Sequence, residues 1–302
     1  MHVHATLKVP FSSRLVAANE ASSGSAVLFS WAPPKFFAWS LLALLVTAVA
    51  RVGAVEPTTD SAVADELKQL NDRTIIRTYV SLDSGWDHFK DGAEKAVWTL
   101  SGLWAARVSD WQDWGIRLNL PFDYYRSDQV TGHGEVGGIG DVELGVGTAF
   151  RLNQAWRTGG GIELHADTAS DPALAQKVWR LKSGWGVSHD FTHWLTLTFN
   201  ADYNHSIAEE DGVRPHRFLE LPLPATVILP QAWALNAQCK TAVDFENDDR
   251  WNHRVLAGIA KQLSKVPIVV SATLEKPLSS GAKRFDVSIT IVYYFQRYHS
   301  LR

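Results

Sequence analysis

The chain has 302 residues, with 29 lysines and arginines against 32 aspartates and glutamates, and its formal net charge is −3. The charges are scattered with mixed sign, so the sequence lacks the basic stripe typical of a nucleic-acid-binding face. The single cysteine, Cys239, excludes an internal disulfide framework and a cysteine-based metal site. The 13 tryptophans are many for this length and point toward a membrane, because indole rings concentrate at membrane interfaces.

An apolar run, FFAWSLLALLVTAVA, extends from Phe36 to Ala50. It is shorter than the roughly 20 residues of a spanning helix and matches the h-region of a secretory signal. We therefore predict a signal peptide over residues 35–54, cleaved after Ala50 or Ala54, with a retained anchor as the alternative. Residues 1–34 exceed a normal n-region and are predicted to be a disordered or non-native extension that results from a start site assigned too early.

Residues 55–73 are polar and are predicted to form a periplasmic linker or a short helix, with Asp60 or Ser61 as its N-cap. From Thr74 onward the helical period is replaced by alternation. In WGIRLNLPFDYY, which begins at Trp114, every second residue from the tryptophan is apolar or aromatic. Strand side chains alternate between two faces, so one face of this segment is wholly apolar. The segment is also longer than the usual strand of about 5 to 6 residues.

The same alternation recurs and predicts twelve strands. Their predicted bounds are 74–82, 96–108, 114–128, 139–152, 156–167, 177–188, 194–204, 218–229, 232–243, 251–263, 267–276 and 284–295. The eighth is the least regular, because it contains Pro222 and Pro224.

The connections between these segments alternate in length. Those after odd-numbered strands are mostly long and polar, such as RSDQVTGHGEVGG, whereas those after even-numbered strands are short, such as NQA. Short turns at one end and long loops at the other are typical of an up-and-down outer-membrane barrel. The predicted fold class is all-β, a transmembrane antiparallel barrel of about twelve strands over residues 74–295, followed by a tail over residues 296–302.

Strand length indicates the solvent of the apolar face. Twelve or thirteen residues at about 3.3 Å each, tilted by about 40°, cover roughly 30 Å along the membrane normal, which exceeds an apolar band of about 25 Å. The alternative is a secreted β-sandwich, which predicts strands about half as long. A sandwich also gives no reason for the aromatic residues near the short turns, which resemble a membrane girdle: Trp114, Trp156, Phe191, Trp194, Trp233 and Phe295.

The segments GIGDVELGVGTAF and WRTGGGIELHADTASD carry a resemblance to a known family. With the aromatic end of the last strand, they resemble bacterial outer-membrane transporters labelled for a MetA pathway of phenol degradation. The resemblance would cover about residues 74–295, and it implies a barrel fold and a link to phenolic compounds. The sequence departs from the usual pattern at its end, because QRYHSLR follows Phe295 where barrel proteins commonly stop at an aromatic residue.

Charged side chains occupy the face opposite the apolar one, and we predict that they face a lumen. The lumen-facing candidates are Arg77, Arg117, Asp123, Asp141, Glu143, Arg151, Arg157, Glu163, His165, Asp167, Arg180, Lys182, Asp202, Glu220 and Asp286. Charges of mixed sign in a low-dielectric wall must pair or stay hydrated. The row therefore predicts either a packed, cross-linked interior or a narrow eyelet for polar or amphipathic solutes.

Three chemical interpretations of particular residues are weaker. The row Arg157, Glu163, His165 and Asp167 could supply metal ligands from one strand face, but a salt-bridged lumen wall explains it as well, and we predict no metal and no cofactor. His205 and Ser206 are the nearest match to a hydrolase pair, yet adjacent strand residues point to opposite faces, so we predict no enzyme. GEVGGIG, over residues 134–140, lacks the Lys-Ser/Thr of a phosphate loop and is predicted to be a flexible surface loop.

Together these features predict an outer-membrane channel of a Gram-negative bacterium for passive or gated passage of small, hydrophobic or aromatic, molecules. The expected partners are outer-membrane lipid, the barrel assembly machinery and small-molecule solutes, with no nucleic acid. The alternative is a structural or adhesive barrel without transport.

Overall fold

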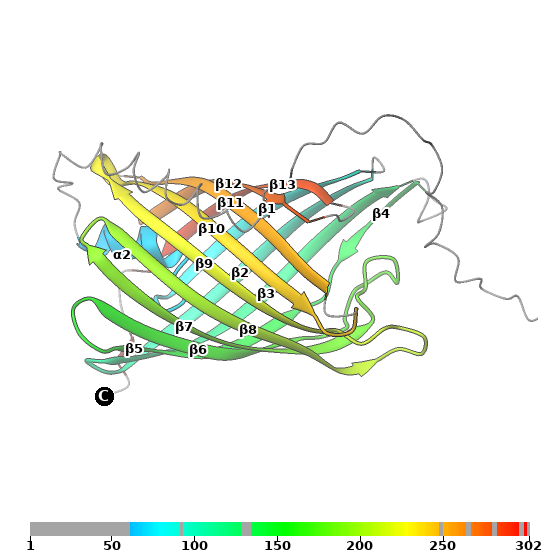
Figure 1. Cartoon of the computed structure of the whole chain (residues 1–302), viewed down its shortest axis with the longest axis horizontal. Coiled ribbons are helices and arrows are strands. Elements are labelled where there is room, and N and C mark those ends of the chain that lie inside the picture. Colours follow the sequence, from blue (N-terminus) through cyan, green and yellow to red (C-terminus); the bar gives the residue numbers. More distant parts are fainter. Residues whose placement is uncertain are drawn as a thin grey trace, which may run out of the picture.

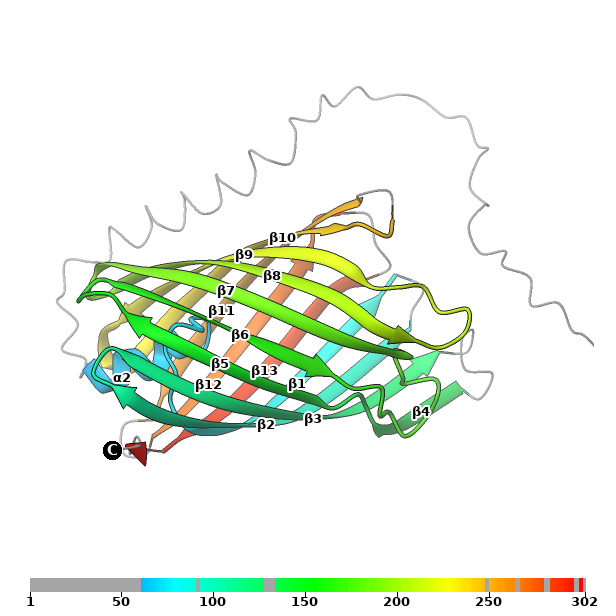
Figure 2. The same cartoon turned by 90° about the horizontal axis from the view of Figure 1, so that it is seen from below.

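The computed structural model describes residues 61–90, 93–127, 134–247, 250–263, 267–279, 283–295 and 299–300. Long tilted strands dominate these ranges and surround a common axis (Figures 1 and 2). The predicted extension, the signal peptide and the first part of the predicted linker lie outside the described residues.

Most strands are longer than those of a typical soluble sheet. Their bounds are β1 (Tyr79–Phe89), β2 (Glu94–Ser109), β3 (Gln112–Ser127), β4 (Gly134–Ile139), β5 (Glu143–Arg151), β6 (Trp156–His165), β7 (Val178–Thr192), β8 (Leu195–Glu209), β9 (Arg217–Leu229), β10 (Trp233–Asp244), β11 (Arg250–Gln262), β12 (Ile268–Pro277), β13 (Lys283–Tyr294) and β14 (His299–Ser300). The helix α2 (Ser61–Gln69) precedes them, and a 3-10 turn, η1 (Pro230–Ala232), joins β9 to β10.

The sheet closes on itself because β1 pairs along its length with both β2 and β13. β4 and β5 pair with successive parts of β3 and therefore share one position in the wall. Counting that position once, β1 to β13 make twelve positions, each antiparallel to the next. The predicted closed, twelve-stranded, up-and-down barrel of the outer-membrane type is confirmed.

The apolar face of the strands points outward, as the alternation predicts. On β3, the side chains of Trp114, Ile116 and Leu118 are exposed on the outer surface, whereas Asp113 and Asp123 on the other face are buried. This arrangement suits a wall that meets hydrocarbon outside and encloses polar groups inside. Among the described residues, the helices are too short or too polar to cross a membrane.

The first predicted strand begins later than expected. The alternation of residues 74–82 predicts a strand from Thr74, whereas β1 begins at Tyr79. Residues 74–78 turn into the barrel instead, where Ile76 packs against Ala105 and Ala149 of the wall. Thr78 is the last of these residues and contacts the wall, because its Oγ1 accepts a hydrogen bond of 3.0 Å from the Ala105 amide.

The fourth predicted strand is interrupted. Residues 134–139, predicted to be flexible loop, form β4 and pair with the far end of β3, and β5 begins only at Glu143. Asp141 lies in the gap, and its carboxylate accepts hydrogen bonds from three amides of the loop 166–177. The same loop covers β4, because the Ser170 amide donates to the Ile139 carbonyl at 2.8 Å. Asp141 therefore anchors a loop at the point where the strand was expected to continue.

The ladder between β8 and β9 has a gap. Leu195–Leu197 pair with residues 225–227, and Asp202–His205 pair with residues 217–220, leaving residues 221–224 without a paired partner on β8. Pro222 and Pro224 lie in this gap and have no amide hydrogen to donate to a neighbouring strand. The irregularity predicted for this strand is confirmed. It affects only one side of β9, because the pairing of β9 with β10 is continuous.

The end of the barrel that carries the short turns is filled from within. α2 lies inside this end, and the chain crosses the lumen from it before it enters β1 (Figures 1 and 2). We call residues 61–78 the plug. The two residues of β14 lie at the same end, where they pair in parallel with Ala106 and Arg107 of β2 beyond the start of β1.

Candidate functional site

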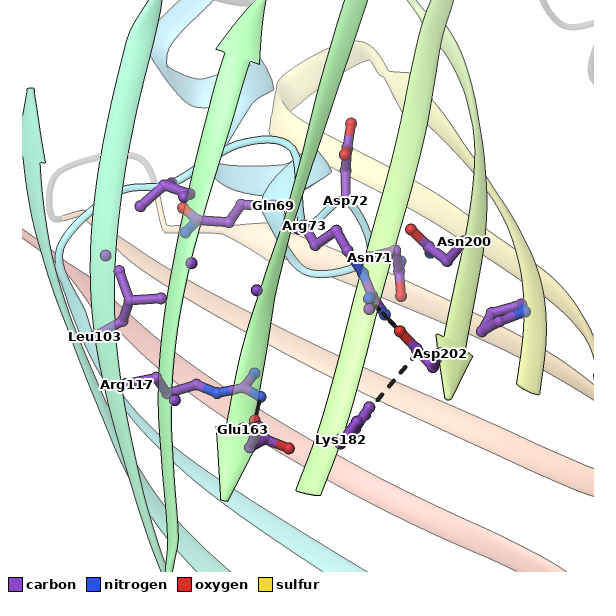
Figure 3. A pocket seen from close by; sticks show the side chains of 18 of the residues that line it. Gln69, Asn71, Asp72, Arg73, Leu103, Arg117, Glu163, Lys182, Asn200 and Asp202 are labelled. Atoms are coloured by element: carbon purple, nitrogen blue, oxygen red, sulfur yellow. Dashed lines mark hydrogen bonds and ion pairs between the residues drawn. The ribbon is translucent and has the colours of Figure 1, made fainter. Parts of the chain in front are cut away.

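A chamber of about 450 Å³ lies inside the barrel against the plug. Residues 69–76 of the plug form one side of it, and side chains from the wall form the other (Figure 3). Its charged lining residues are Asp72, Arg73, Arg117, Glu163, Lys182, Asp202, Glu220 and Lys240. A chamber of this size is within the range of small-molecule sites, about 300–1,000 Å³.

The helix of the plug is held by an apolar cluster at the short-turn end. Leu67 is fully buried against wall residues from β9 to β13: Ile228, Ala234, Ala260, Val269, Val292 and Tyr294. Next to it, the Glu66 carboxylate accepts a hydrogen bond of 2.6 Å from Gln262, and the Glu66 carbonyl accepts one of 3.0 Å from the Tyr294 hydroxyl. Burial raises the pKa of Asp65 on the same helix, against the opposing attraction of Lys68.

The turn after the helix is held by Asp72. Its Oδ1 accepts hydrogen bonds from the amide and hydroxyl of Thr74, at 2.9 and 2.6 Å, which closes the turn locally. Its Oδ2 accepts bonds from Ser188 at 2.6 Å and from Arg157 at 3.1 Å, both on the wall. Asp72 therefore fixes both the shape of the turn and its position against β6 and β7.

A second carboxylate holds the plug from the wall side. Asp190 of β7 pairs with Lys68 of the plug at 3.1 Å and with Arg157 at 2.6 Å. Arg157 thus bridges one carboxylate on the plug and one on the wall. The arrangement satisfies buried charges of both signs, which a low-dielectric interior requires.

Arg73 extends from the plug across the chamber to β8. Both of its terminal nitrogens contact the Asp202 carboxylate, with Nη2 to Oδ2 at 2.6 Å (Figure 3). Lys182 of β7 lies 4.0 Å from the same carboxylate. On the other side of the chamber, Arg117 of β3 forms an ion pair with Glu163 of β6. A further pair joins Lys240 to Glu220 at 2.7 Å.

Glu143, Glu163 and His165 form a cluster next to the chamber, and their ligand atoms lie close enough to hold one metal ion. Two guanidinium groups already contact the cluster. Arg180 Nη2 lies 3.0 Å from His165 Nδ1, and Arg117 contacts Glu163. Two cations balance the two carboxylates, so a metal ion would have to displace arginines. The arrangement therefore fits an ion-pair network better than a metal centre.

A smaller cavity of about 220 Å³ lies inside the barrel, nearer the long loops, and is lined by residues of β1, β2, β11, β12 and β13. It is lined by the carboxylates of Asp83, Asp87, Glu275 and Asp286. Lys283 contacts Asp87 and lies 2.9 Å from Asp286, and Arg254 lies 3.3 Å from Glu275. Three of these four carboxylates thus pair with two cations of the wall, and the fourth, Asp83, accepts a hydrogen bond from the Thr290 hydroxyl.

The wall beside the chamber is made thin by glycines. Gly147, Gly160, Gly161 and Gly184 line the chamber on the inside and also line an apolar groove of about 540 Å³ on the outer surface. A Cβ on Gly160 would overlap the Gly184 carbonyl and the Trp185 ring. The ring is itself fixed by a hydrogen bond of 2.8 Å from its indole nitrogen to Thr158. Only backbone separates chamber and groove at this point.

The structure distributes the predicted lumen residues over several places. Five of them line the chamber: Arg117, Glu163, Lys182, Asp202 and Glu220. Three more lie beside it: Glu143 and His165 belong to the cluster with Glu163, and Arg180 contacts that cluster. Four others form separate contacts within the wall or with the plug: Asp123 with Lys95 at 2.8 Å, Arg151 with Asp113 at 3.4 Å, Arg157 with the plug, and Asp286 with Lys283.

Three of the predicted residues do not lie on the expected strands. Arg77 belongs to the plug, where its Nη1 lies 3.5 Å from Glu66. Asp141 lies in the break between β4 and β5, and Asp167 follows the end of β6 in the loop 166–177. Of the row considered above as possible metal ligands, Glu163 and His165 belong to the cluster with Glu143, whereas Arg157 contacts the plug and Asp167 lies in the loop.

Asp72 and Arg73, which complete the chamber from the plug, were not among the predicted lumen residues. Their segment was predicted to be a periplasmic linker or a short helix, because the pattern of a short polar helix does not distinguish a lumen from water. A signal was nevertheless present, since Val63, Leu67 and Leu70 recur at helical spacing, and all three are part of the apolar packing described above.

The two residues considered for a hydrolase are separated by the wall. His205 lies exposed on the outer surface and stacks with Tyr203, whereas Ser206 is buried inside. The Ser206 hydroxyl accepts a hydrogen bond from the His216 amide at 3.0 Å and contacts Glu209. His205 and Ser206 thus cannot act as a pair in this arrangement.

No protein-family description and no curated protein matches the sequence. Solved structures do match. A COG4313 outer membrane channel from Pseudomonas putida F1 superposes with a TM-score of 0.63 at 14% identity, covering 73% of this chain and 96% of that one. The NanC porin superposes with a TM-score of 0.50 at 12% identity, covering 72% of this chain and 99% of that one. At these identities the likeness shows the barrel fold, and the MetA-pathway resemblance stays a prediction.

Proposed function

We propose that this protein is an outer-membrane channel of a Gram-negative bacterium that lets small solutes cross by diffusion. The observation that carries the proposal is a charged chamber enclosed by a barrel whose outer surface is apolar. A channel needs a polar interior for its solute and an apolar exterior for its lipid. The similarity in fold to an outer membrane channel supports the same conclusion.

In this proposal the plug is the gate. It fills the short-turn end, which faces the periplasm in barrels of this type. The pair between Arg73 and Asp202 is the contact best placed to open, because the arginine is partly exposed and water can hydrate it. A solute would enter between the long loops, reach the chamber, and leave when the chain around Arg73 moves aside. The expected solutes are small molecules with a hydrophobic or aromatic body, because Ile76, Tyr79 and Leu103 line the chamber among the charges.

The proposed partners follow from the fold. The outer surface would meet outer-membrane lipid, and a barrel of this type would be inserted by the barrel assembly machinery. The proposed precursor carries a signal peptide over residues 35–54. N-terminal sequencing of the mature protein tests that part of the proposal, with Arg51 or Val55 expected as the first residue.

The competing function is a structural barrel without transport. The number of contacts between the plug and the wall favours it, because a plug anchored by Leu67, Asp72 and Arg73 could be permanent. The two functions differ in whether the intact protein passes any solute.

Solute flux into proteoliposomes separates them. The mature chain would be reconstituted, its insertion verified by protection from protease, and the entry of small sugars and small phenols followed by light scattering. A channel gives swelling that increases with the amount of inserted protein and falls with solute size. Inserted protein that gives no more swelling than empty liposomes would support the structural barrel instead.

A further inference from the structure

The eight charged residues of the chamber are not equally accessible. Its four cationic side chains, those of Arg73, Arg117, Lys182 and Lys240, are between 21% and 39% exposed. Its four carboxylates, those of Asp72, Glu163, Asp202 and Glu220, are only between 2% and 10% exposed. The formal charges cancel, yet the surface that a solute touches is cationic.

Side-chain length explains the difference. Aspartate and glutamate are short and stay close to the backbone, where hydroxyl, amide and guanidinium groups cover them. Arginine and lysine have long apolar stems that carry the charge toward water. In Figure 3, Arg73 and Arg117 reach Asp202 and Glu163, and in each pair the guanidinium group is the more exposed partner.

The lysines have hydrogen-bond donors left for a ligand. An ammonium group has three donors. Lys240 contacts Glu220 at 2.7 Å, which uses one of them, and Lys182 lies 4.0 Å from Asp202, which is longer than a hydrogen bond. An anion in the chamber could accept hydrogen bonds from these groups, whereas a cation would meet repulsion before it reached a carboxylate.

The remaining lining suits an apolar body. Ile76, Tyr79, Leu103 and Pro222 line the chamber together with six glycines of β3, β5, β6 and β7. We infer that the chamber binds a small organic anion, a carboxylate attached to a compact apolar or aromatic group. This inference rests on the proposed channel function and names the class of its solute. Rings of lysine or arginine select anions in other pores by the same physics.

Ion selectivity of the full mature chain tests the inference first. The reversal potential would be measured in a planar bilayer under a tenfold KCl gradient, and we expect chloride to be preferred over potassium. Lys182→Met is the informative variant, because Asp202 keeps its partner Arg73 after the change. It is expected to lower the chloride preference severalfold. Lys177→Met removes the same charge from the loop 166–177, outside the chamber, and is the matched control.

Three probes of similar shape then test the ligand class: benzoate, benzyl alcohol and benzylamine. Benzoate is expected to block the chloride current at the lowest concentration. Lys182→Met should weaken its block about tenfold, which corresponds to about 1.4 kcal/mol, and leave the block by benzyl alcohol unchanged. A preference for potassium, or equal block by all three probes, would overturn the inference.

A silent protein would overturn the channel function without deciding the ligand. Binding of the same probes to the folded protein in detergent, measured by calorimetry, decides it in that case. Benzoate binding that exceeds benzylamine binding and is weakened by Lys182→Met supports an anion site in a closed barrel. Equal or absent binding of the three probes overturns the anion site.

Discussion

Arg73 of the plug donates hydrogen bonds to Asp202 of β8 from both terminal nitrogens of its guanidinium group, and the Asp202 side chain is only 3% exposed. The pair joins a segment inside the barrel to the middle of the wall, across the chamber that a solute must pass. Arginine makes such two-pronged contacts because its planar group matches a carboxylate. Opening the chamber toward the short-turn end therefore requires this contact to break or to move.

Replacing Arg73 by alanine is expected to release the plug from β8. The free energy that holds the plug against β8 should fall by roughly 1–3 kcal/mol. The lower figure is favoured because the arginine is partly exposed. Limited proteolysis of the folded barrel in detergent measures the effect, because a released plug is cut faster. Arg214→Ala breaks an exposed loop contact with Asp244 and serves as the control. Equal cleavage of the two variants would show that Arg73 does not hold the plug.

Leu67→Ala is expected to weaken the helix end of the plug by about 2–5 kcal/mol, because it leaves a cavity in a fully buried apolar cluster. In limited proteolysis, the variant is expected to be cut faster within the plug. Its barrel should still migrate as a folded protein when it is run unheated on a detergent gel. Leu82→Ala makes the same change on the outer surface, where the side chain is exposed, and should leave the plug protected. If both variants behave like the wild type, the apolar cluster does not anchor the helix.

Burial raises the pKa of Asp65, while Lys68 and Arg157 act in the opposite direction. A raised pKa means that the folded protein holds the proton more tightly than the unfolded chain, so stability falls as the pH rises above the ordinary aspartate value of about 3.9. Asp65→Asn is therefore expected to be more stable than the wild type at pH 7, with the advantage vanishing below that value. Thermal unfolding at both pH values measures the difference.

Asp211→Asn removes a carboxylate from an exposed loop and is the control for that comparison. A lower unfolding temperature for Asp65→Asn at pH 7 would mean that the attraction of Lys68 exceeds the effect of burial. The pKa of Asp65 would then be lowered in the folded protein.

Gly160→Ala is expected to reduce the yield of folded barrel, because the new methyl group would overlap the Gly184 carbonyl and the Trp185 ring. Gly102→Ala adds the same methyl group where no atom lies within 4 Å, so it should fold like the wild type. The fraction that resists unfolding in cold detergent gels gives the yield. Equal yields would show that the glycine wall tolerates side chains.

Asp141→Asn is expected to loosen the loop 166–177. The carboxylate accepts bonds from the amides of Thr168, Ala169 and Gln176 at 3.0, 3.1 and 2.9 Å, and an asparagine offers only one oxygen for them. The loss is about 1–3 kcal/mol. Faster amide exchange in the loop, with unchanged exchange in β5, is the expected observation. Asp167→Asn removes one carboxylate charge from the loop itself, and it should increase amide exchange in the loop less than Asp141→Asn does.

The strands of the barrel wall could be predicted from the sequence, because the alternation within one segment is enough to identify a strand. The alternation of Trp114, Ile116 and Leu118 gives both the strand and its outward face, without knowledge of its neighbours. The same rule failed at residues 74–78, where Ile75 and Ile76 are adjacent and the backbone turns inward. A period of two cannot separate a strand from an extended segment that enters the lumen.

The chamber could be predicted only in part. Its wall residues were found because a charge in an outer-membrane strand must face inward, as for Arg117 and Asp202. Its plug residues were missed because the role of Arg73 depends on a carboxylate 129 residues later in the chain. Such a pairing is a property of the folded barrel, and no local pattern around Arg73 marks it.

Single-channel conductance of the mature chain in a planar bilayer, compared with that of Arg73→Ala, tests the central claim most directly. If the plug gates a passage through the charged chamber, the wild type gives discrete steps and the variant gives larger or more frequent ones. If inserted protein is silent in both forms, or if both give the same steps, the chamber is not a passage controlled by the plug.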